Sequence, residues 1–138
     1  MIKKKRKKRS AKAIAKDKAW DACSEYIRRK FAVDGYTTCV TCGVTKPWKE
    51  MQAGHYVDGR NNTVLFMEEI IYPQCFSCNM GKKGNKIKYT AFMMRKGYTM
   101  DELDTLDNLK FGIKKMSTND FKEKEEYFLT KLNQLKPN

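Results

Sequence analysis

The sequence has few of the features that mark membrane proteins or secreted, disulfide-stabilised proteins. No apolar run approaches the roughly 20 residues that a membrane span needs, and the basic N-terminus is not followed by the apolar stretch of a signal peptide. The five cysteines are odd in number and accompany no secretory signal, which disfavours a disulfide framework. We therefore expect no membrane association, a reducing cytoplasm and a metal site. Histidine is also scarce, since His55 is the only one in the chain.

Positive charge is abundant instead, and it is distributed unevenly. The net charge is +13, and residues 1–30 hold 13 basic and three acidic residues, whereas residues 101–138 hold seven and eight. The run KKKRKKR at 3–9 makes residues 1–9 a predicted disordered basic arm. An excess of this size points to a nucleic-acid partner, through counterion release and long-range attraction. The alternative is a solvated tail that helps solubility.

The hydrophobic pattern predicts a single α+β domain over residues 10–138. We expect an N-terminal helix at 10–33, a small β core with metal at 37–97, and C-terminal helices at 99–136. Ser10 is suited to cap the first helix, and Gly35 in VDGY to end it. The apolar face of that helix recurs at helical spacing in Ile14, Trp20, Cys23, Ile27 and Phe31. Because Cys23 lies on this face, we interpret it as a core thiol.

Residues 37–78 read as short β segments with turns between them. The expected strands are TTCV, MQAGHYV and, after the loop DGRNN, TVLFM. Helix returns in NKIKYTAFMMRKG, whose predicted buried face is Ile87, Ala91 and Met94. Thr99 and Glu102 have the spacing of a capping box for the next helix. The last helix carries one apolar stripe, formed by Phe121, Phe128, Leu132 and Leu135.

Four cysteines form two CxxC pairs, and this spacing is typical of a zinc knuckle. Each pair points two sulfurs at a common centre, so the two pairs together complete a tetrahedral site, formed by Cys39, Cys42, Cys75 and Cys78. The alternatives are two redox motifs or unliganded thiols, but nothing near either pair resembles a thioredoxin-type unit. A closed four-thiolate site is structural, so we expect this Zn²⁺ to hold the β segment together without doing chemistry.

The residues around these pairs resemble a known family. The chain reads CVTCG at 39–43, AGHY at 53–56 and PQCFSCNMGKKGN at 73–85, with Glu68 in an F-x-E element. This combination is similar to the ββα-metal (HNH) endonucleases, in the zinc-clipped version of phage recombination endonuclease VII. It is most similar to the phage NinG/Rap recombination proteins, which are nucleases of branched DNA. The likeness runs from about Trp20 to the C-terminus.

The resemblance implies a small ββα-metal (HNH-like) core with two catalytic positions. His55 falls on the catalytic histidine and Asn79 on the asparagine that directly follows the last cysteine. The chemistry agrees, because neutral histidine can activate water near pH 7 and a divalent cation stabilises the phosphate charge. The alternatives are a structural histidine for His55 and a helix cap for Asn79.

Basic residues near these two positions are candidates for holding the DNA backbone. The candidates are Arg60, Lys82, Lys83, Lys86 and Lys88, and the alternative for the lysine run is a solvated face.

The sequence departs from the family pattern at several positions. Gly54 stands where many of these nucleases carry a metal-binding aspartate, and Glu69, Ile70 and Tyr72 replace the usual Arg, Asn and His. Asn79 therefore needs a carboxylate partner to hold catalytic Mg²⁺ or Mn²⁺. Glu68 falls on the family's glutamate and is our preferred candidate, with Asp58 as the other.

We therefore interpret the chain as a phage recombination endonuclease that hydrolyses branched DNA, such as Holliday junctions or D-loops, in the bacterial host cytoplasm. Paired nicks across a junction need two sites, which a homodimer through the C-terminal helices would supply. The alternatives are a non-catalytic zinc DNA-binding module with a decayed HNH site, or an RNA- or ribosome-associated zinc-ribbon protein.

Overall fold

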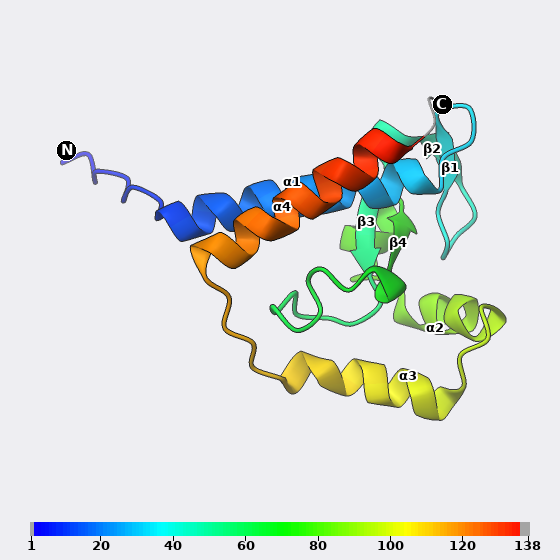
Figure 1. Cartoon of the computed structure of the whole chain (residues 1–138). Helices are drawn as coiled ribbons and strands as arrows, with labels where there is room; N and C mark the ends of the chain where they lie inside the picture. Colours follow the sequence, from blue (N-terminus) through cyan, green and yellow to red (C-terminus); the bar gives the residue numbers. More distant parts are fainter. Residues whose placement is uncertain (1, 136–138) are drawn as a thin grey trace.

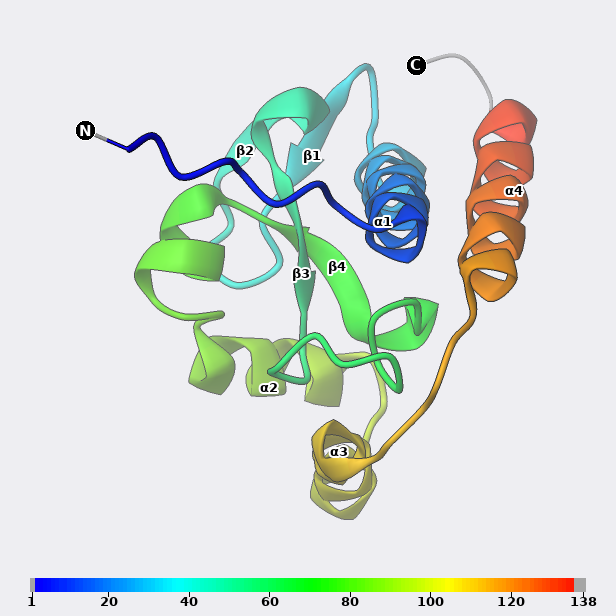
Figure 2. The same cartoon turned by 90° about the vertical axis from the view of Figure 1, so that its left-hand side faces the viewer.

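The computed structural model describes residues 2–135, and the predicted α+β class is confirmed for them. One β ribbon lies near the middle, with helices on both sides of it (Figures 1 and 2). The ribbon consists of β3 (Gln52–His55) and β4 (Ile71–Gln74), paired antiparallel with His55 opposite Ile71. The helices α1 (Ala11–Lys30) and α4 (Thr118–Gln134) lie on one side, and α2 (Lys86–Arg95) and α3 (Met100–Asp107) on the other.

Helix α1 begins as predicted and ends earlier than predicted. The Ser10 side chain accepts a hydrogen bond from the backbone N–H of Ala13, which confirms the cap. The helix ends at Lys30, short of residue 33, because the chain reverses at once in a tight turn. Asp34 and Gly35 have φ values of 51° and 81° in this turn, which an α-helix does not accommodate.

Helices α1 and α4 run side by side in the same direction and pack against each other along one side of the core (Figure 1). The predicted stripe of α4 is confirmed at Phe121, Phe128 and Leu132, and the Phe128 ring lies 6.0 Å from that of Tyr26. The Thr99–Glu102 capping box of α3 is present as well. The predicted helix end at 136 and residue 1 of the arm lie outside the described residues. No described helix has the length and apolarity to cross a bilayer.

The predicted strand TVLFM is wrong. Thr63–Met67 forms consecutive turns, in which Val64 and Leu65 both donate to the carbonyl of Asn61, and β3 pairs with Ile71–Gln74 instead. Val64, Leu65 and Phe66 are all buried. A continuous apolar run fits a fully buried strand as well as a coil that is packed on every side, and here the turn hydrogen bonds to Asn61 select the coil.

The predicted buried face of α2 is also wrong. Ile87 is 86% exposed and Met94 is exposed, whereas Tyr89 and Met93 are fully buried. The segment carries apolar residues on two faces, and hydrogen bonding decides between them. The Tyr89 hydroxyl donates to the backbone carbonyl of Gly54 at 2.7 Å, which turns that face toward the ribbon.

The cysteine-bearing loop belongs to a second small sheet. Its strands β1 (Tyr36–Thr38) and β2 (Thr45–Pro47) pair antiparallel, and the first CxxC lies in the loop between them. The sequence analysis located β1 and missed β2. This sheet is joined to the ribbon by a hydrogen bond from the Val40 N–H to the Pro73 carbonyl, at 3.1 Å.

The ribbon requires glycine at position 54. A Cβ at Gly54 would lie 1.9 Å from Oε1 of Gln74, whose side chain is fully buried. The Gln74 Nε2 is held in place by the Thr41 hydroxyl and by the carbonyl of Gly84, at 3.1 and 2.9 Å. An aspartate at position 54 would therefore collide with Gln74, which gives a physical reason for the departure from the family pattern.

We expect Gly54→Ala to lower the free energy of unfolding by about 1–3 kcal/mol, the usual cost of overpacking a core. Chemical denaturation monitored by circular dichroism measures this cost. In a Gln74→Ala background, where the colliding amide is absent, the same substitution should cost clearly less. Equal costs in the two backgrounds would show that Gln74 is not what fixes glycine at this position.

Candidate functional site

The four cysteine sulfurs of the two CxxC pairs lie within 4.8 Å of one another. The Cys42 and Cys75 sulfurs are 3.7 Å apart. A tetrahedral zinc with Zn–S bonds of about 2.3 Å places its ligands about 3.8 Å apart, so the donors fit this metal. Cys39, Cys75 and Cys78 are buried and Cys42 is exposed. The cluster connects the β1–β2 loop to the residues that follow β4.

The closeness of these thiols also affects their protonation. Burial disfavours the Cys39 thiolate, but hydrogen bonds from the Thr41 hydroxyl and nearby backbone lower its pKa to about 6. The Val44 N–H favours the Cys42 thiolate, yet burial and the neighbouring sulfurs raise its pKa to about 12. Four adjacent thiolates repel one another, and a bound Zn²⁺ offsets this repulsion. Cys23 is fully buried in the main core, away from this cluster, with a pKa raised to about 12 by burial.

We expect purified protein to contain one zinc per chain, measured by elemental analysis. Cys75→Ser leaves three thiolates, so it should lose the metal and make residues 37–80 sensitive to protease. Cys23→Ser is the matched control, because it also replaces a buried thiol and should keep the zinc. Zinc-free wild-type protein, or zinc loss in Cys23→Ser, would contradict the assignment.

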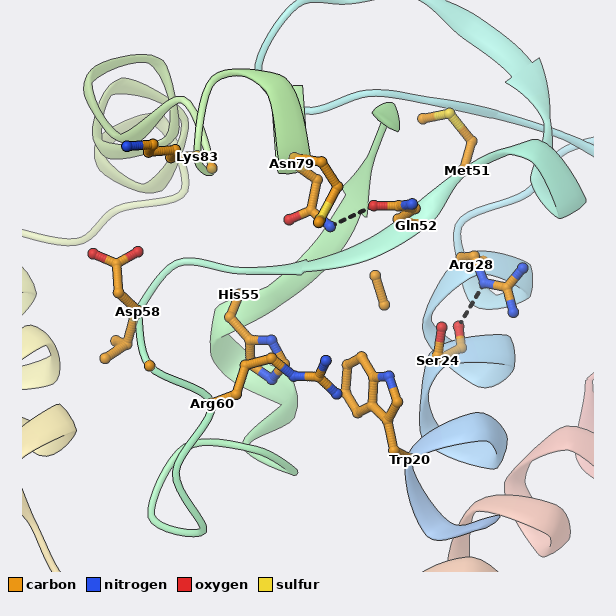
Figure 3. A pocket seen from close by; sticks show the side chains of 15 residues that line it. Trp20, Ser24, Arg28, Met51, Gln52, His55, Asp58, Arg60, Asn79 and Lys83 are labelled. Atoms are coloured by element: carbon orange, nitrogen blue, oxygen red, sulfur yellow. Dashed lines mark hydrogen bonds between the residues drawn. The ribbon is translucent and has the colours of Figure 1, made fainter. Parts of the chain in front are cut away.

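His55 lies at the end of β3 on the wall of a cavity of 520 Å³ (Figure 3). Its Nε2 is 3.0 Å from the Leu65 carbonyl, which can only accept, so this nitrogen carries the proton. Nδ1 is then the nitrogen that is free to take up a proton. The imidazole ring stacks on Trp20 of α1, with ring centroids 4.9 Å apart.

The surroundings of His55 keep it neutral. Burial lowers the pKa of the imidazole below its ordinary value of 6.5, and the Arg60 charge lowers it further, against the opposing effect of the Leu65 carbonyl. A neutral imidazole at pH 7 is the form that acts as a base.

Asn79 reaches the same cavity from the short helical turn Ser77–Gly81, which follows β4. Its Nδ2 donates to Oε1 of Gln52 at 2.6 Å, which leaves its Oδ1 pointing into the cavity (Figure 3). Asp58, exposed in the loop after β3, also lines the cavity. A carboxylate and an amide oxygen are ligands that Mg²⁺ accepts, with water and substrate phosphate as the remainder. Asp58 and Asn79 are therefore the oxygen ligands that the lining of this cavity offers to a divalent cation.

The structure does not bring Glu68 into this cavity. Glu68 begins a single 3-10 turn, Glu68–Ile70, and accepts a hydrogen bond from the hydroxyl of Tyr127 on α4 at 2.9 Å. Its negative charge adds to burial in raising the pKa of the Cys23 thiol and of the Tyr26 hydroxyl. The turn directs the side chain toward Tyr127 of α4, so Glu68 does not line the cavity, whereas Asp58, the other candidate carboxylate, does.

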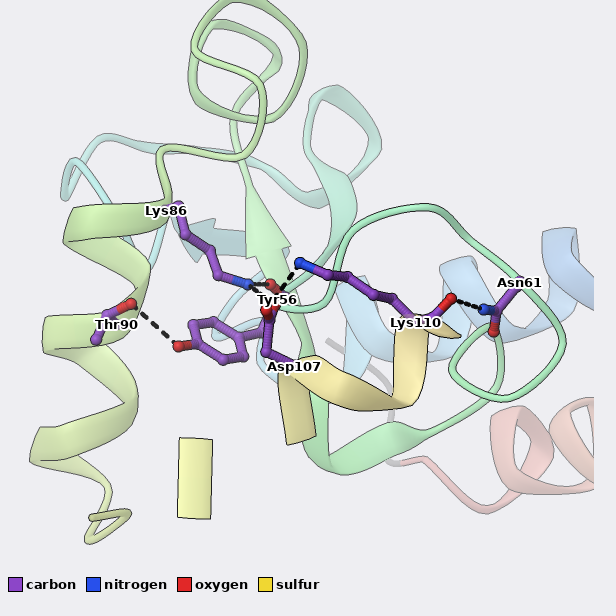
Figure 4. A network of polar contacts seen from close by, with 6 residues as sticks. All are labelled: Tyr56, Asn61, Lys86, Thr90, Asp107 and Lys110. Carbon is purple, nitrogen blue, oxygen red and sulfur yellow. Dashed lines mark hydrogen bonds and ion pairs between the residues drawn. The ribbon is translucent and has the colours of Figure 1, made fainter. Parts of the chain in front are cut away.

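The predicted DNA-binding cations fall into three groups. The Arg60 guanidinium lies 4.7 Å from the Trp20 ring centroid, and Lys83 lines the cavity, while Lys82 and Lys88 are exposed outside its lining. Lys86 is different, because it is half-buried and paired with Asp107 at 2.9 Å (Figure 4). Lys86 also donates to the carbonyl of Tyr56. It therefore links α2 to the end of α3.

Sequence reasoning missed one wall of the cavity. Trp20, Ser24 and Arg28 are spaced by four residues on α1 and all line it (Figure 3). A polar and aromatic stripe beside the apolar face of this helix was the available signal. Gln52 carried no comparable signal, because its role depends on where Asn79 lies.

The comparisons with known proteins gave one match. The family model described as Bacteriophage Lambda NinG protein matches residues 1–138. No curated protein and no solved structure matches the chain. Because the family model covers the entire sequence, the chain belongs to the bacteriophage lambda NinG family.

Proposed function

We propose that this protein is a divalent-metal-dependent endonuclease of phage recombination that cuts branched DNA. The observation that carries the proposal is that His55, Asp58 and Asn79 line the same cavity. The Leu65 carbonyl holds one ring nitrogen of His55, and the other nitrogen is free. Family membership supports phage recombination as the setting. The preference for branched DNA rests on the resemblance of the sequence motifs.

The charge of the cavity favours a phosphate substrate. Arg28, Arg60 and Lys83 line it, against the single carboxylate of Asp58. Arginine binds phosphate oxygens through paired N–H donors, and Lys83 adds a point charge at the rim. A cation held by Asp58 and Asn79 would supply charge stabilisation at the phosphate.

The role of His55 follows from its hydrogen bonding. Nδ1 takes a proton from water, the water oxygen bonds to phosphorus, and the ester P–O bond breaks as the leaving oxygen takes a proton from solvent. The Nε2–H remains bonded to the Leu65 carbonyl throughout, so the ring keeps its orientation and the imidazolium is stabilised. Stacking on Trp20 restricts rotation of the ring.

We expect His55→Ala to lower the rate of Mg²⁺-dependent nicking of a synthetic four-way junction by roughly 10²–10⁴, the usual loss for a positioned acid–base group. Zinc content and junction binding should not change. Gln134→Ala, exposed near the end of α4, is the control and should cut at the wild-type rate. His55→Ala protein that cuts normally would refute the assignment and favour a structural histidine.

The dependence of the cleavage rate on pH provides a second test. Because burial lowers the His55 pKa, the base form persists below pH 6.5, and activity should fall only as pH drops through that lower value. The profile should therefore show an acid limb with its midpoint below 6.5. A midpoint at or above 6.5 would mean that another group, or a more exposed histidine, controls the rate. Wild-type protein that binds junctions but never cuts them would favour the non-catalytic alternative.

The basic arm generates a prediction about DNA binding. Residues 2–9 are exposed, without helix or strand, and extend away from α1 on the side that faces the viewer in Figure 2. Deleting residues 3–9 should weaken binding to all DNAs alike and flatten its salt dependence, since these seven cations release counterions without reading shape. Fluorescence anisotropy across a salt series measures both effects. Loss of junction preference with unchanged duplex affinity would contradict this role.

A further inference from the structure

Residues 109–115 display two large apolar side chains to solvent. Phe111 is 74% exposed and Ile113 is 90% exposed. Lysines flank them at 110, 114 and 115, and the Lys110 ammonium lies 5.3 Å from the Phe111 ring centroid. Single exposed apolar residues are common, but two large ones in one short segment flanked by lysines form a candidate contact surface for a partner.

The backbone of this segment is fixed by the loop that follows β3. Asn61 and Asn62 donate through their Nδ2 atoms to the carbonyls of Lys110 and Lys114, at 2.6 and 3.0 Å, and Figure 4 shows the Asn61 bond. The Thr63 hydroxyl donates to the carbonyl of Leu109 at 2.6 Å. Three side chains therefore hold a segment about 50 residues away in sequence, and the apolar tips are presented by an ordered backbone.

Close packing at Gly112 supports the same conclusion. A Cβ at Gly112 would lie 2.8 Å from Cγ2 of Thr63, so only glycine lets the segment approach the loop this closely. On the other side, Asp107 pairs with Lys110 at 2.8 Å and with Lys86 at 2.9 Å, which ties the start of the segment to α2 (Figure 4).

The same loop builds the candidate active site. It contributes Asp58 and Arg60 to the cavity, and its Leu65 carbonyl holds His55. The loop that anchors the segment of Phe111 and Ile113 is therefore the same loop that positions the residues proposed to act on a phosphodiester. A nucleic acid seated on the cavity is the partner that this continuity favours.

We propose that Phe111 and Ile113 form an apolar wedge that packs against unstacked bases at a DNA branch point, while Lys114 and Lys115 contact the flanking phosphates. This inference rests on the proposed function and names the surface that would recognise the branch. Bases in a continuous duplex are stacked on both faces, whereas those at a branch can be unstacked at low cost. Apolar wedges and aromatic platforms bind such bases without reading sequence.

The test uses the full chain and a four-way junction with 2-aminopurine beside the branch point, against a duplex of the same sequence. Wild-type protein should raise the 2-aminopurine fluorescence of the junction, because the base leaves the stack. Phe111→Ala/Ile113→Ala should abolish this rise and lower junction affinity by about tenfold or more, as for loss of a stacking contact. Its duplex affinity should stay at the wild-type level. Val33→Ala, at a position 71% exposed in the turn after α1, is the control for loss of exposed apolar surface.

Any other outcome of this test contradicts the proposed apolar wedge. An unchanged fluorescence rise in the double variant, or equal loss of junction and duplex binding, would show that the pair does not read the branch. A wild-type dimer that becomes monomeric in the double variant, measured by sedimentation, would identify the pair as a contact between two copies. Wild-type protein that binds neither DNA refutes the proposed function itself. Wild-type junction cutting alongside a failed wedge leaves the nuclease proposal standing.

Discussion

The convergence of four thiols on one point is the constraint on which the β part of this protein depends. Their sulfurs lie within 4.8 Å of one another, and thiolates at that distance repel unless a cation lies between them. A Zn²⁺ bound there would join the β1–β2 loop to the chain just after β4. Gln52 pairs with Gln74 at this end of the ribbon, and His55 lies about 10 Å along β3, at the usual rise of 3.3 Å per residue. An isolated two-stranded ribbon this short is marginally stable, so a metal bound at this end would help to hold β3 and its histidine in place.

The loop between β3 and β4 organises the other half of the site. Its turns bury Val64 and Leu65 in the core, and the Leu65 carbonyl fixes the tautomer of His55. Arg60 has a φ of 48° and lies over Trp20, so the loop also connects the ribbon to α1. Through Asn61 it holds the segment before α4. A long connection without regular structure is thus the best-anchored part of the cavity, because its hydrogen bonds are made by side chains and turns.

The sequence predicted the features that depend on spacing and left open those that depend on three-dimensional packing. The cysteine pairs, the caps at Ser10 and Thr99 and the stripe of α4 follow local rules, and the structure agrees with each. The strand at 63–67 failed because a buried apolar run does not distinguish a strand from a packed coil. The face of α2 failed because a tyrosine hydroxyl, bonded to a carbonyl 35 residues away, selected between two apolar faces. Glu68 lies outside the cavity lining because its carboxylate is held by the hydroxyl of Tyr127 on α4, a contact that a motif alignment does not register.

The packing of α1 against α4 also determines the order in which the parts of the molecule can fold. Tyr26 and Phe128 are neighbours in space but about 100 residues apart along the chain. The face of α1 that carries Tyr26 therefore stays uncovered until α4 is synthesised. Contacts of such long range are slow to form, because loop closure precedes any gain from burial. The metal-bound ribbon has only shorter loops to close and is therefore free to form first on the ribosome, where synthesis proceeds from the N-terminus. A nascent chain would therefore be able to bind Zn²⁺ at the four cysteines before α4 covers the Tyr26 face of α1.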